Sequence, residues 1–384
     1  MKVAIVSHAY VEPGYSPVLE SMAACPGIQL ALITPDKYRG RFQRSPGAFE
    51  NQVHGLRTYA LPIIFGKRQG AFLYGFKALS RALDDFHPDL LLHEQEVYSL
   101  GAAQIAAAAK KRSIPLVMFV WENLHRSLSW PRRRNVQYVL GHCAGLIAGS
   151  TGAEQVHRDW GYRGKTSIIP QMGIPLRNPS PFFGRRNADS FSVCFAGRLV
   201  PEKGIDCLLR AIALVRYKGI RIRCNIAGNG PDLQNLTALR DSLGIADVVD
   251  FKGRLCVEEV RDLLAKSDAL VLPSRKTGIW EEQFGLILIE AMSEATVTIG
   301  SRTGAIPEVI GSDALLFGEN DHQHLAVILE RLASNNAELA EQQQRLWNRV
   351  DKLYTNDILA VRRATFLRQV HLSSITQSSQ ARHL

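Results

Sequence analysis

Two carboxylates with seven residues between them, Glu282 and Glu290, are the side chains whose spacing points most directly to chemistry. Between them, Phe284-Gly285-Leu286 reads as a loop that turns into a helix. Gly allows a ligand to approach the backbone, and the N–H groups and dipole of an opening helix favour a phosphate. Each carboxylate can then hold one hydroxyl-rich end of a ligand with phosphate between them, as in a nucleotide sugar. The alternative for this stretch alone is a helix with an acidic start.

A second stretch in the same half of the chain supports a phosphate ligand. Phe191 to Ala196 reads as a strand, and Gly197-Arg198-Leu199-Val200-Pro201-Glu202-Lys203-Gly204 follows it before a helix. An Arg fork and a Lys point charge suit a diphosphate, so Arg198 and Lys203 are candidate ligands, with a merely basic loop as the alternative. The turn at Gly228 is expected to approach a base or ribose, and Arg254 ends the next strand.

Buried strands alternate with helices along the whole chain, which predicts doubly wound parallel sheets. One of the expected helices runs from about Ala71 to Phe86. Ligands bind such sheets at the carboxyl ends of the strands. In the first half, the candidate residues at these ends are Gly14, His93, Glu94, Glu96, Trp121, Glu122 and His125. The alternative interpretation is that these residues belong to solvated loops that bind no ligand.

A length of 384 residues predicts two domains. We expect a first Rossmann-like domain over 1–178, a second over 179–350, a C-terminal helix over 351–372 that crosses back to the first, and a disordered tail over 373–384. No apolar run reaches the roughly 18 residues of a membrane span, and the N-terminus reads as a buried strand and not as a signal peptide. The six Cys form no C-x-x-C pair. We therefore expect buried thiols in a reducing cytoplasm and no metal site.

The net charge of +10 is unevenly divided. Residues 1–178 contain 21 Lys and Arg against 12 Asp and Glu, whereas 179–384 contain 25 against 24. The densest basic cluster is Arg126 with Arg132, Arg133 and Arg134, beside Trp130. This excess predicts an acidic partner for the first half, such as an anionic membrane surface, an acidic glycan or nucleic acid. No nucleic-acid-binding module is recognisable, so nucleic acid is the least favoured of the three.

The second half resembles the family 4 retaining glycosyltransferases, which have the GT-B fold. The matching motifs are G-R-L-V-P-E-K-G at 197–204, G-N-G-P at 228–231, E-Q-F-G-L-I-L-I-E-A at 282–291 and T-G-A-I-P-E-V-I at 303–310. They occur in the family's order and spacing. The first half matches only in its plan of strands and helices.

The resemblance implies roles for these residues. Arg198 and Lys203 would hold the donor diphosphate, Glu282 the transferred sugar and Glu290 the ribose, with the backbone at Phe284, Gly285 and Leu286 meeting sugar or phosphate. The family needs no metal. This chain departs from the family at Pro13-Gly14-Tyr15, where many members have Gly-Gly, and at Trp121, where many have a His that contacts the donor sugar.

We therefore predict a metal-independent, retaining hexosyltransferase with Glu282, Arg198 and Lys203 at its catalytic centre and a nucleotide-sugar donor, UDP or GDP being favoured. The expected acceptor is a glycan or a lipid-linked glycan of polysaccharide or glycolipid synthesis, met in the cytoplasm at the inner face of the membrane. The alternatives are a non-catalytic nucleotide-sugar- or glycan-binding GT-B scaffold, for which Trp121 is the clue, and another GT-B sugar-nucleotide enzyme such as an epimerase.

Overall fold

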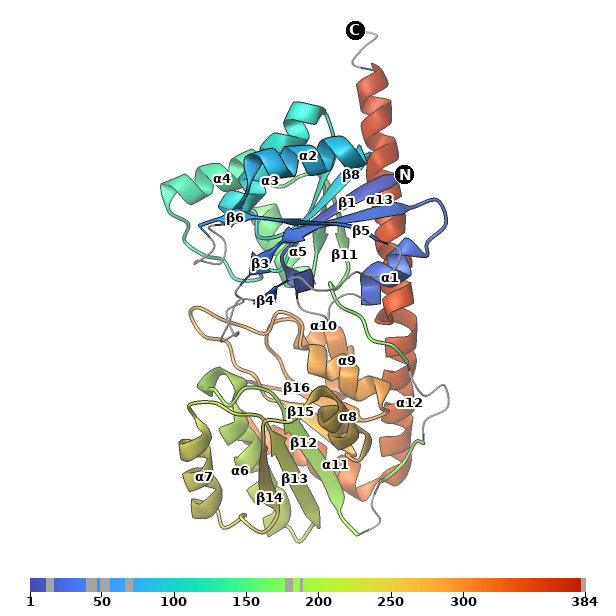
Figure 1. Cartoon of the computed structure of the whole chain (residues 1–384). Helices are drawn as coiled ribbons and strands as arrows, with labels where there is room; N and C mark the ends of the chain where they lie inside the picture. Colours follow the sequence, from blue (N-terminus) through green and yellow to red (C-terminus); the bar gives the residue numbers. More distant parts are fainter. Residues whose placement is uncertain are drawn as a thin grey trace. The chain divides into compact units, whose positions relative to one another are not determined.

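The computed structural model describes residues 1–11, 17–38, 47–48, 56–65, 72–176, 182–186 and 189–380. Contacts divide the chain into two units (Figure 1). The first unit combines Met1–Gly173 with Asn356–Leu384, and the second is Ile174–Thr355. The chain therefore leaves the first unit once and returns to it once.

The described part of the first unit contains a seven-stranded sheet in which every pairing is parallel. The order is β11-β10-β9-β8-β1-β2-β5. Its strands are β1 (Lys2–Ser7), β2 (Gln29–Pro35), β5 (Arg57–Leu61), β8 (Leu90–Glu94), β9 (Leu116–Val120), β10 (Cys143–Ala148) and β11 (Lys165–Ile168). Two short antiparallel pairs accompany it: β3 (Lys37–Tyr38) with β4 (Gly47–Ala48), and β6 (Ile63–Ile64) with β7 (Leu73–Tyr74).

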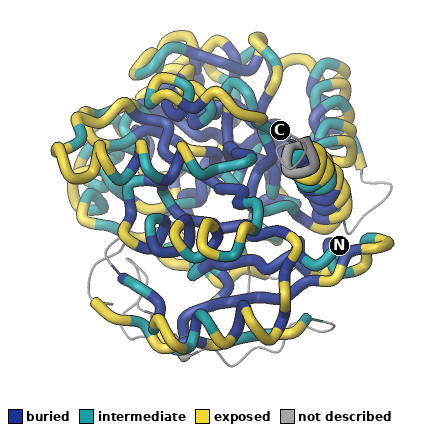
Figure 2. The backbone as a smooth tube through the Cα atoms, turned by 90° about the horizontal axis from the view of Figure 1, so that it is seen from above, coloured by how far each residue is buried: buried dark blue, intermediate teal, exposed yellow. Residues whose placement is uncertain are grey.

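Helices cover both faces of this sheet because successive strand residues point to opposite sides. Ala4 and Val6 pack with α2 (Phe76–Phe86), α3 (Leu100–Arg112), α4 (Trp130–Gly141) and α5 (Thr151–Asp159). Val3 and Ile5 pack with α1 (Pro17–Ala23) and α13 (Asn356–Gln380). The central strands β8 and β9 are buried along their length, whereas the edge strands β5 and β11 are partly exposed. In Figure 2 the helices alternate between buried and exposed residues, as amphipathic helices do.

The described part of the second unit contains a six-stranded parallel sheet of order β14-β13-β12-β15-β16-β17. Its strands are β12 (Phe191–Ala196), β13 (Ile222–Ala227), β14 (Val249–Gly253), β15 (Ala269–Leu272), β16 (Val297–Ser301) and β17 (Leu316–Phe317). Its helices are α6 (Ile205–Tyr217), α7 (Leu233–Ser242), α8 (Val257–Ala265), α9 (Leu286–Ser293), α10 (Ile306–Ile310), α11 (His322–Ser334) and α12 (Asn336–Leu353).

The two parallel sheets with helices between their strands confirm the predicted α/β fold class. The contact boundaries fall at 173/174 and 355/356, close to the predicted 178/179 and 350/351. The structure differs from the predicted disordered tail, because α13 continues to Gln380, and only 381–384 lie outside the described residues. It also differs at 73–74, where a short strand stands in place of the first turns of the predicted helix.

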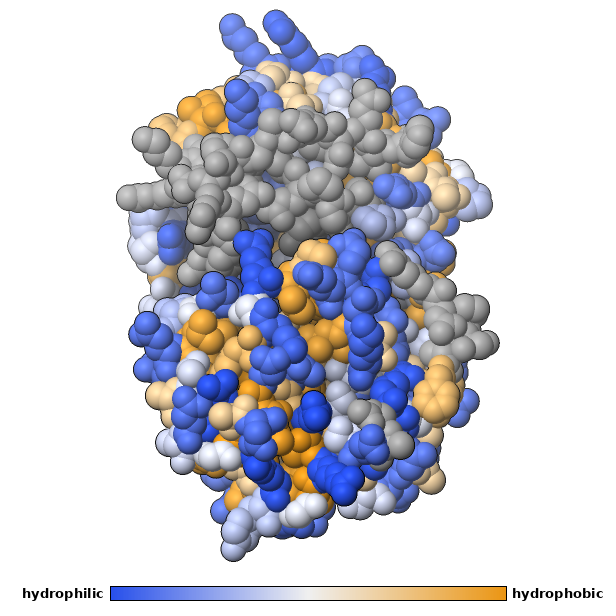
Figure 3. Space-filling view, turned by 60° about the horizontal axis from the view of Figure 1, so that its bottom comes forward, coloured by the Kyte–Doolittle hydropathy of each residue, from blue (hydrophilic) through white to orange (hydrophobic). Residues whose placement is uncertain are grey.

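The described surface mixes polar and apolar side chains. Figure 3 shows one face, on which hydrophilic side chains surround smaller groups of hydrophobic ones. No helix in the described ranges is long and apolar enough to cross a bilayer.

Candidate functional site

The motif residues of the second unit lie where its parallel strands end. From β12 the chain adds β13 and β14 on one side of the sheet, and then β15, β16 and β17 on the other. Strand order therefore reverses between β12 and β15, which is the place where ligands bind in such sheets. The loop 197–204 follows β12 and the loop 273–285 follows β15, so both border this point. The backbone N–H of Arg275 donates to the carbonyl of Glu202 at 2.8 Å and joins the two loops.

Lys203 and Glu282 meet at this junction. The Lys203 Nζ donates to Glu282 Oε2 at 2.6 Å, and the Ser274 hydroxyl donates to the same oxygen at 3.0 Å. Their side chains are 14% and 10% exposed, so the pair is largely shielded from water. The ammonium also lies 5.0 Å from the centre of the Trp280 ring, within range of a cation–π attraction. The predicted phosphate-binding cation and the predicted sugar-binding carboxylate are thus in direct contact.

The backbone around Glu282 is fixed by two glycines in the left-handed region. Gly304 has φ +51°, and a Cβ there would lie 2.0 Å from the Glu282 carbonyl oxygen, which also accepts the Ala305 N–H at 3.0 Å. Gly285, at φ +78°, precedes α9, and Leu286 is the first residue of this helix, as predicted. The N–H groups of the first turn of α9 therefore open beside Phe284 and Glu282, where an anion would be stabilised.

Glu290 lines a separate cavity of about 190 Å³ between α8 and α9. Burial raises the pKa of its carboxyl group, and the positive charge of Arg261 opposes this shift. Cys256 lies on the same cavity wall and is the exposed member of the six free cysteines, three of which are buried. Arg198 and Arg254 follow β12 and β14 and are exposed. Gly228 follows β13 at the same edge.

In the first unit, the predicted residues are held by internal hydrogen bonds. Glu94 is 3% exposed. Its Oε1 accepts from the Tyr10 hydroxyl at 3.0 Å and lies 3.5 Å from Arg363 Nη1, and its Oε2 accepts from Gln171 Nε2 at 2.8 Å. Gln171 Oε1 in turn accepts the indole N–H of Trp121 at 2.9 Å. This chain of bonds runs from α13, through the end of β8, to the end of β9.

Glu122, His125 and His93 also have partners within the first unit. Glu122 accepts from the Tyr98 hydroxyl at 3.2 Å and from Arg126, and His125 Nε2 lies 3.0 Å from Asp159 Oδ2. His93 donates from Nδ1 to the Val6 carbonyl at 2.8 Å, and burial lowers its pKa to about 4, so the ring is neutral. Gly14 lies outside the described residues.

Sequence reasoning missed several residues that complete these arrangements. Ser274 and Trp280 surround the Lys203–Glu282 pair, and Tyr10, Gln171 and Arg363 satisfy Glu94. Ser274 directly follows a predicted strand, so its position in the sequence could have identified it as a candidate site residue. Arg363 lies 269 residues from Glu94 in the chain, and no local pattern links them.

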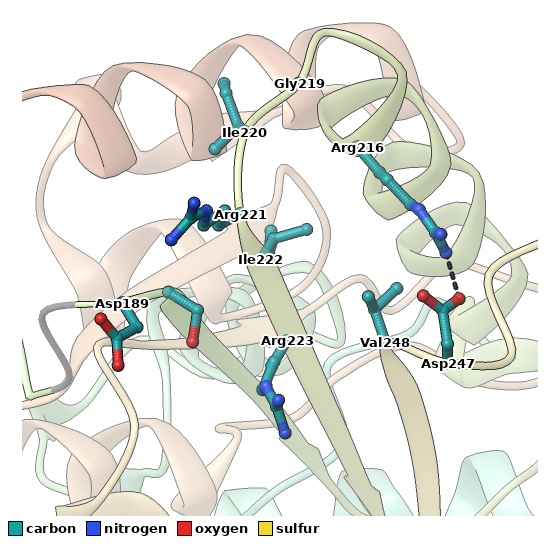
Figure 4. A pocket seen from close by; sticks show the side chains of 10 residues that line it. Asp189, Arg216, Gly219, Ile220, Arg221, Ile222, Arg223, Asp247 and Val248 are labelled. Atoms are coloured by element: carbon teal, nitrogen blue, oxygen red, sulfur yellow. Dashed lines mark hydrogen bonds and ion pairs between the residues drawn. The ribbon is translucent and has the colours of Figure 1, made fainter.

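A wider hollow of about 500 Å³ lies at the opposite edge of the second sheet, where β12, β13 and β14 begin (Figure 4). There Arg216 points toward Asp247 and forms an ion pair with it. Arg221 and Arg223 line the same hollow. None of the motif residues lies here, so we assign the functional site to the carboxyl edge. Within the described residues, no group of three or more His, Cys, Asp or Glu is arranged to hold a metal ion.

Two family models match consecutive parts of the chain. The model described as Glycosyltransferase Family 4 matches residues 21–172, and the model described as Glycosyl transferases group 1 matches 177–350. Among curated relatives, the MMP alpha-(1->4)-mannosyltransferase of Mycolicibacterium hassiacum is 28% identical over 274 residues, which cover 65% of this chain and 63% of that protein. A D-inositol 3-phosphate glycosyltransferase of Streptomyces avermitilis is 30% identical over 194 residues, or 46% of this chain and 40% of that protein. The matched stretches thus span less than two thirds of either relative.

Solved structures share the architecture over nearly the whole chain. The Anabaena protein Alr3699/HepE in complex with UDP superposes with a TM-score of 0.73 at 18% identity, covering 96% of this chain and all of that one. Sucrose-phosphate synthase from Thermosynechococcus elongatus gives 0.71 at 18% identity, covering 97% and 100%. At this identity the similarity establishes the fold alone.

Proposed function

The chain belongs to glycosyltransferase family 4 and has the GT-B fold, and we propose that it transfers a sugar from a nucleotide-sugar donor to an acceptor hydroxyl with retention of the anomeric configuration. The contact between Lys203 and Glu282 at the reversal point of the second sheet carries this proposal. Lys203 Nζ and Glu282 Oε2 lie 2.6 Å apart beside the N-terminus of α9, which supports a role for the cation in binding the diphosphate and for the carboxylate in binding sugar hydroxyls.

In this reaction the bond between the anomeric carbon and the diphosphate oxygen breaks as the acceptor oxygen bonds to the same carbon. The leaving diphosphate gains negative charge, which the Lys203 ammonium, the exposed Arg198 and the first-turn N–H groups of α9 stabilise. The acceptor hydroxyl loses its proton to the departing phosphate oxygen on the same face of the sugar. No step in this scheme uses a metal ion. Glu282 holds sugar hydroxyls and orients the anomeric carbon.

Glu290 and the cavity beside it suit the nucleoside part of the donor. A carboxylate accepts two ribose hydroxyl hydrogens, and the cavity of about 190 Å³ continues along α8 past Cys256. Burial of Glu290 means that donated hydrogen bonds from a ribose would replace hydration that the carboxylate has lost. Gly228 and Arg254, at the ends of β13 and β14, border the same region of the sheet edge.

For the acceptor we propose a glycan or lipid-linked glycan handled at an anionic membrane surface of the cytoplasm. One relative is named as a GDP-mannose-dependent phosphatidylinositol monomannoside mannosyltransferase, which acts on a glycolipid. In this chain, Trp130 is 67% exposed at the start of α4, and the Arg134 guanidinium lies 4.8 Å from the centre of its ring. Arg132 and Arg133 are exposed on the same turn. An aromatic ring among arginines suits the interface of an anionic bilayer.

A thermal-shift screen against UDP-, GDP-, ADP- and dTDP-sugars tests the donor assignment. We expect one nucleotide sugar to raise the melting temperature, and Lys203→Ala and Glu290→Ala to abolish this shift. Release of the nucleotide in the presence of acceptor then tests turnover. Binding without release would support the non-catalytic scaffold, and interconversion of two nucleotide sugars would support an epimerase. Sedimentation with anionic against neutral liposomes at low salt tests the membrane surface, and equal binding to both would reject it.

A further inference from the structure

Glu96, in the loop after β8, binds the loop that follows β9. Its Oε1 accepts the backbone N–H of Trp121 at 2.7 Å and that of Glu122 at 2.9 Å. Two N–H groups on one carboxyl oxygen fix the direction in which the chain leaves β9. The segment 121–126 carries Trp121, Glu122, His125 and Arg126, the polar and aromatic side chains nearest this strand end.

The second oxygen of Glu96 faces a buried histidine. Glu96 Oε2 lies 3.9 Å from His157 Nε2, and within the described residues neither atom has a hydrogen-bond partner. His157 lies on α5 with a fully buried side chain, and its Nδ1 donates to the Ala153 carbonyl at 2.7 Å. Because Nδ1 carries the hydrogen, a neutral ring presents only a lone pair at Nε2. A protonated Glu96 is the partner that complements this lone pair.

The surroundings of Glu96 favour its protonated form on balance. Burial raises the pKa of Glu96 to about 7, and the Glu122 carboxylate contributes to the rise, while the two backbone N–H groups and Arg126 oppose it. Burial lowers the pKa of His157 to about 4. Tyr98 is the other titratable group here, and its hydroxyl donates to Glu122. Between the two pKa values the proton therefore resides on the carboxyl group and not on the imidazole.

We propose that Glu96 is a positioning residue of the transferase, which holds the 121–126 loop in place while its carboxyl group carries a proton that faces His157, and which shifts this loop when that proton is lost. Once the proton is lost, Oε2 would face the His157 lone pair with no donor and would lie close to the Glu122 carboxylate. Oε1 would keep its two N–H donors, so a movement of the carboxylate would shift the loop with it. This inference rests on the proposed glycosyl transfer. It adds that ionisation of a residue in the first unit lowers kcat/KM of that reaction as the pH rises.

Glu96→Gln tests the inference because the carboxamide imitates the protonated acid. Its oxygen still accepts the two N–H groups, and its NH₂ donates to His157 at every pH. We expect kcat/KM of the wild-type protein to fall roughly tenfold between about pH 6 and about pH 8, and that of Glu96→Gln to stay level. Glu96→Ala loses the loop contact and should be impaired throughout. Glu154→Gln, on the same helix as His157 but hydrogen-bonded to Arg158, is the matched control and should follow the wild-type profile.

A second readout does not depend on activity. An acid whose pKa is raised by folding stabilises the folded state most at low pH, and this contribution disappears as the pH rises to the folded pKa. Relative to Glu96→Gln, the folded-to-unfolded ratio of the wild-type protein should therefore fall roughly 70-fold between about pH 5 and about pH 8. Parallel unfolding curves of the two proteins would overturn the inference, as would an alkaline fall in kcat/KM that Glu96→Gln retains. If no nucleotide sugar binds, the proposed function fails. The comparison of unfolding between the wild-type protein and Glu96→Gln then still decides whether Glu96 carries a proton in the folded protein.

Discussion

Replacing Glu282 by Gln should separate binding of the leaving group from transfer of the sugar. Glu282 accepts a hydrogen bond from Lys203, so a diphosphate that binds this ammonium competes with the carboxylate. A Gln of the same shape removes the negative charge and leaves Lys203 available. We therefore expect the nucleoside diphosphate to bind more tightly to Glu282→Gln, while turnover of the nucleotide sugar falls because the carboxylate no longer holds the sugar hydroxyls.

The size of the effect follows from the contact between the two side chains. The 2.6 Å distance from Lys203 Nζ to Glu282 Oε2 is that of a charge-assisted hydrogen bond, and both side chains are at most 14% exposed. Such a bond contributes about 1.5–3 kcal/mol, whereas the neutral bond to Gln contributes about 1 kcal/mol. The difference of about 0.5–2 kcal/mol corresponds to a Kd lower by roughly 2- to 30-fold.

Calorimetric titration of the nucleoside diphosphate into both proteins measures this difference. Glu281→Gln is the matched control, because Glu281 is the neighbouring residue and its carboxylate pairs with Lys276 Nζ at 3.1 Å instead of Lys203. This variant should bind the diphosphate as the wild-type protein does. Equal or weaker binding by Glu282→Gln would refute the view that Glu282 and the diphosphate compete for Lys203.

Three further results are expected at the same edge of the second sheet. A maleimide should label Cys256 first, because it is the exposed cysteine, and bound nucleotide sugar should slow this labelling. The Cys256→Ser variant is the control, and labelling that the nucleotide sugar does not slow would count against a donor beside α8. Because burial raises the pKa of Glu290, the folded protein loses stability as the pH rises from the unfolded toward the folded pKa. Glu290→Gln should remove this loss in unfolding experiments while weakening donor binding; a variant less stable than wild type at neutral pH would contradict this. Gly304→Ala places a Cβ 2.0 Å from the Glu282 carbonyl oxygen, so it should lower the free energy of unfolding by about 1–3 kcal/mol and also weaken donor binding. Gly278→Ala is the control, because no atom lies within 4 Å of its Cβ, and it should change neither stability nor donor binding appreciably.

The strand plan could be predicted because parallel strands buried on both faces form short apolar runs that end in Gly or polar residues. Phe191–Ala196 is an example, and its predicted bounds equal those of β12. Lys203 and Glu282 were each predicted to bind the donor, but their direct contact was not predicted; it arises because the loops after the neighbouring strands β12 and β15 meet at one edge. The prediction was wrong at 73–74 because aromatic residues before Gly75 satisfy a helical pattern as well as a strand, and pairing of β7 with β6 decides between them.

The interior of the first unit could not be predicted in the same way. Glu94, Glu122 and His93 stand at strand ends, and their polarity suggested contact with a ligand. In the structure Glu94 and His93 also have partners distant in the chain, among them Arg363 and Val6. A sequence without an alignment gives no sign that a helix 269 residues away supplies a buried cation. Burial of a polar side chain is decided by tertiary packing, which local patterns do not encode.

The pairing of Ile174 with Thr355 has a consequence for the genetic modularity of this chain. The second unit is one uninterrupted segment, and its two ends are bridged to each other, with the Ile174 N–H donating to the Tyr354 carbonyl at 3.1 Å. Along the chain, the second unit is therefore inserted between the two segments that form the first unit. Segments whose ends lie together tolerate excision, exchange and circular permutation. Residues 174–355 therefore form a natural cassette for making chimaeras in which the second unit of one family member is combined with the first unit of another.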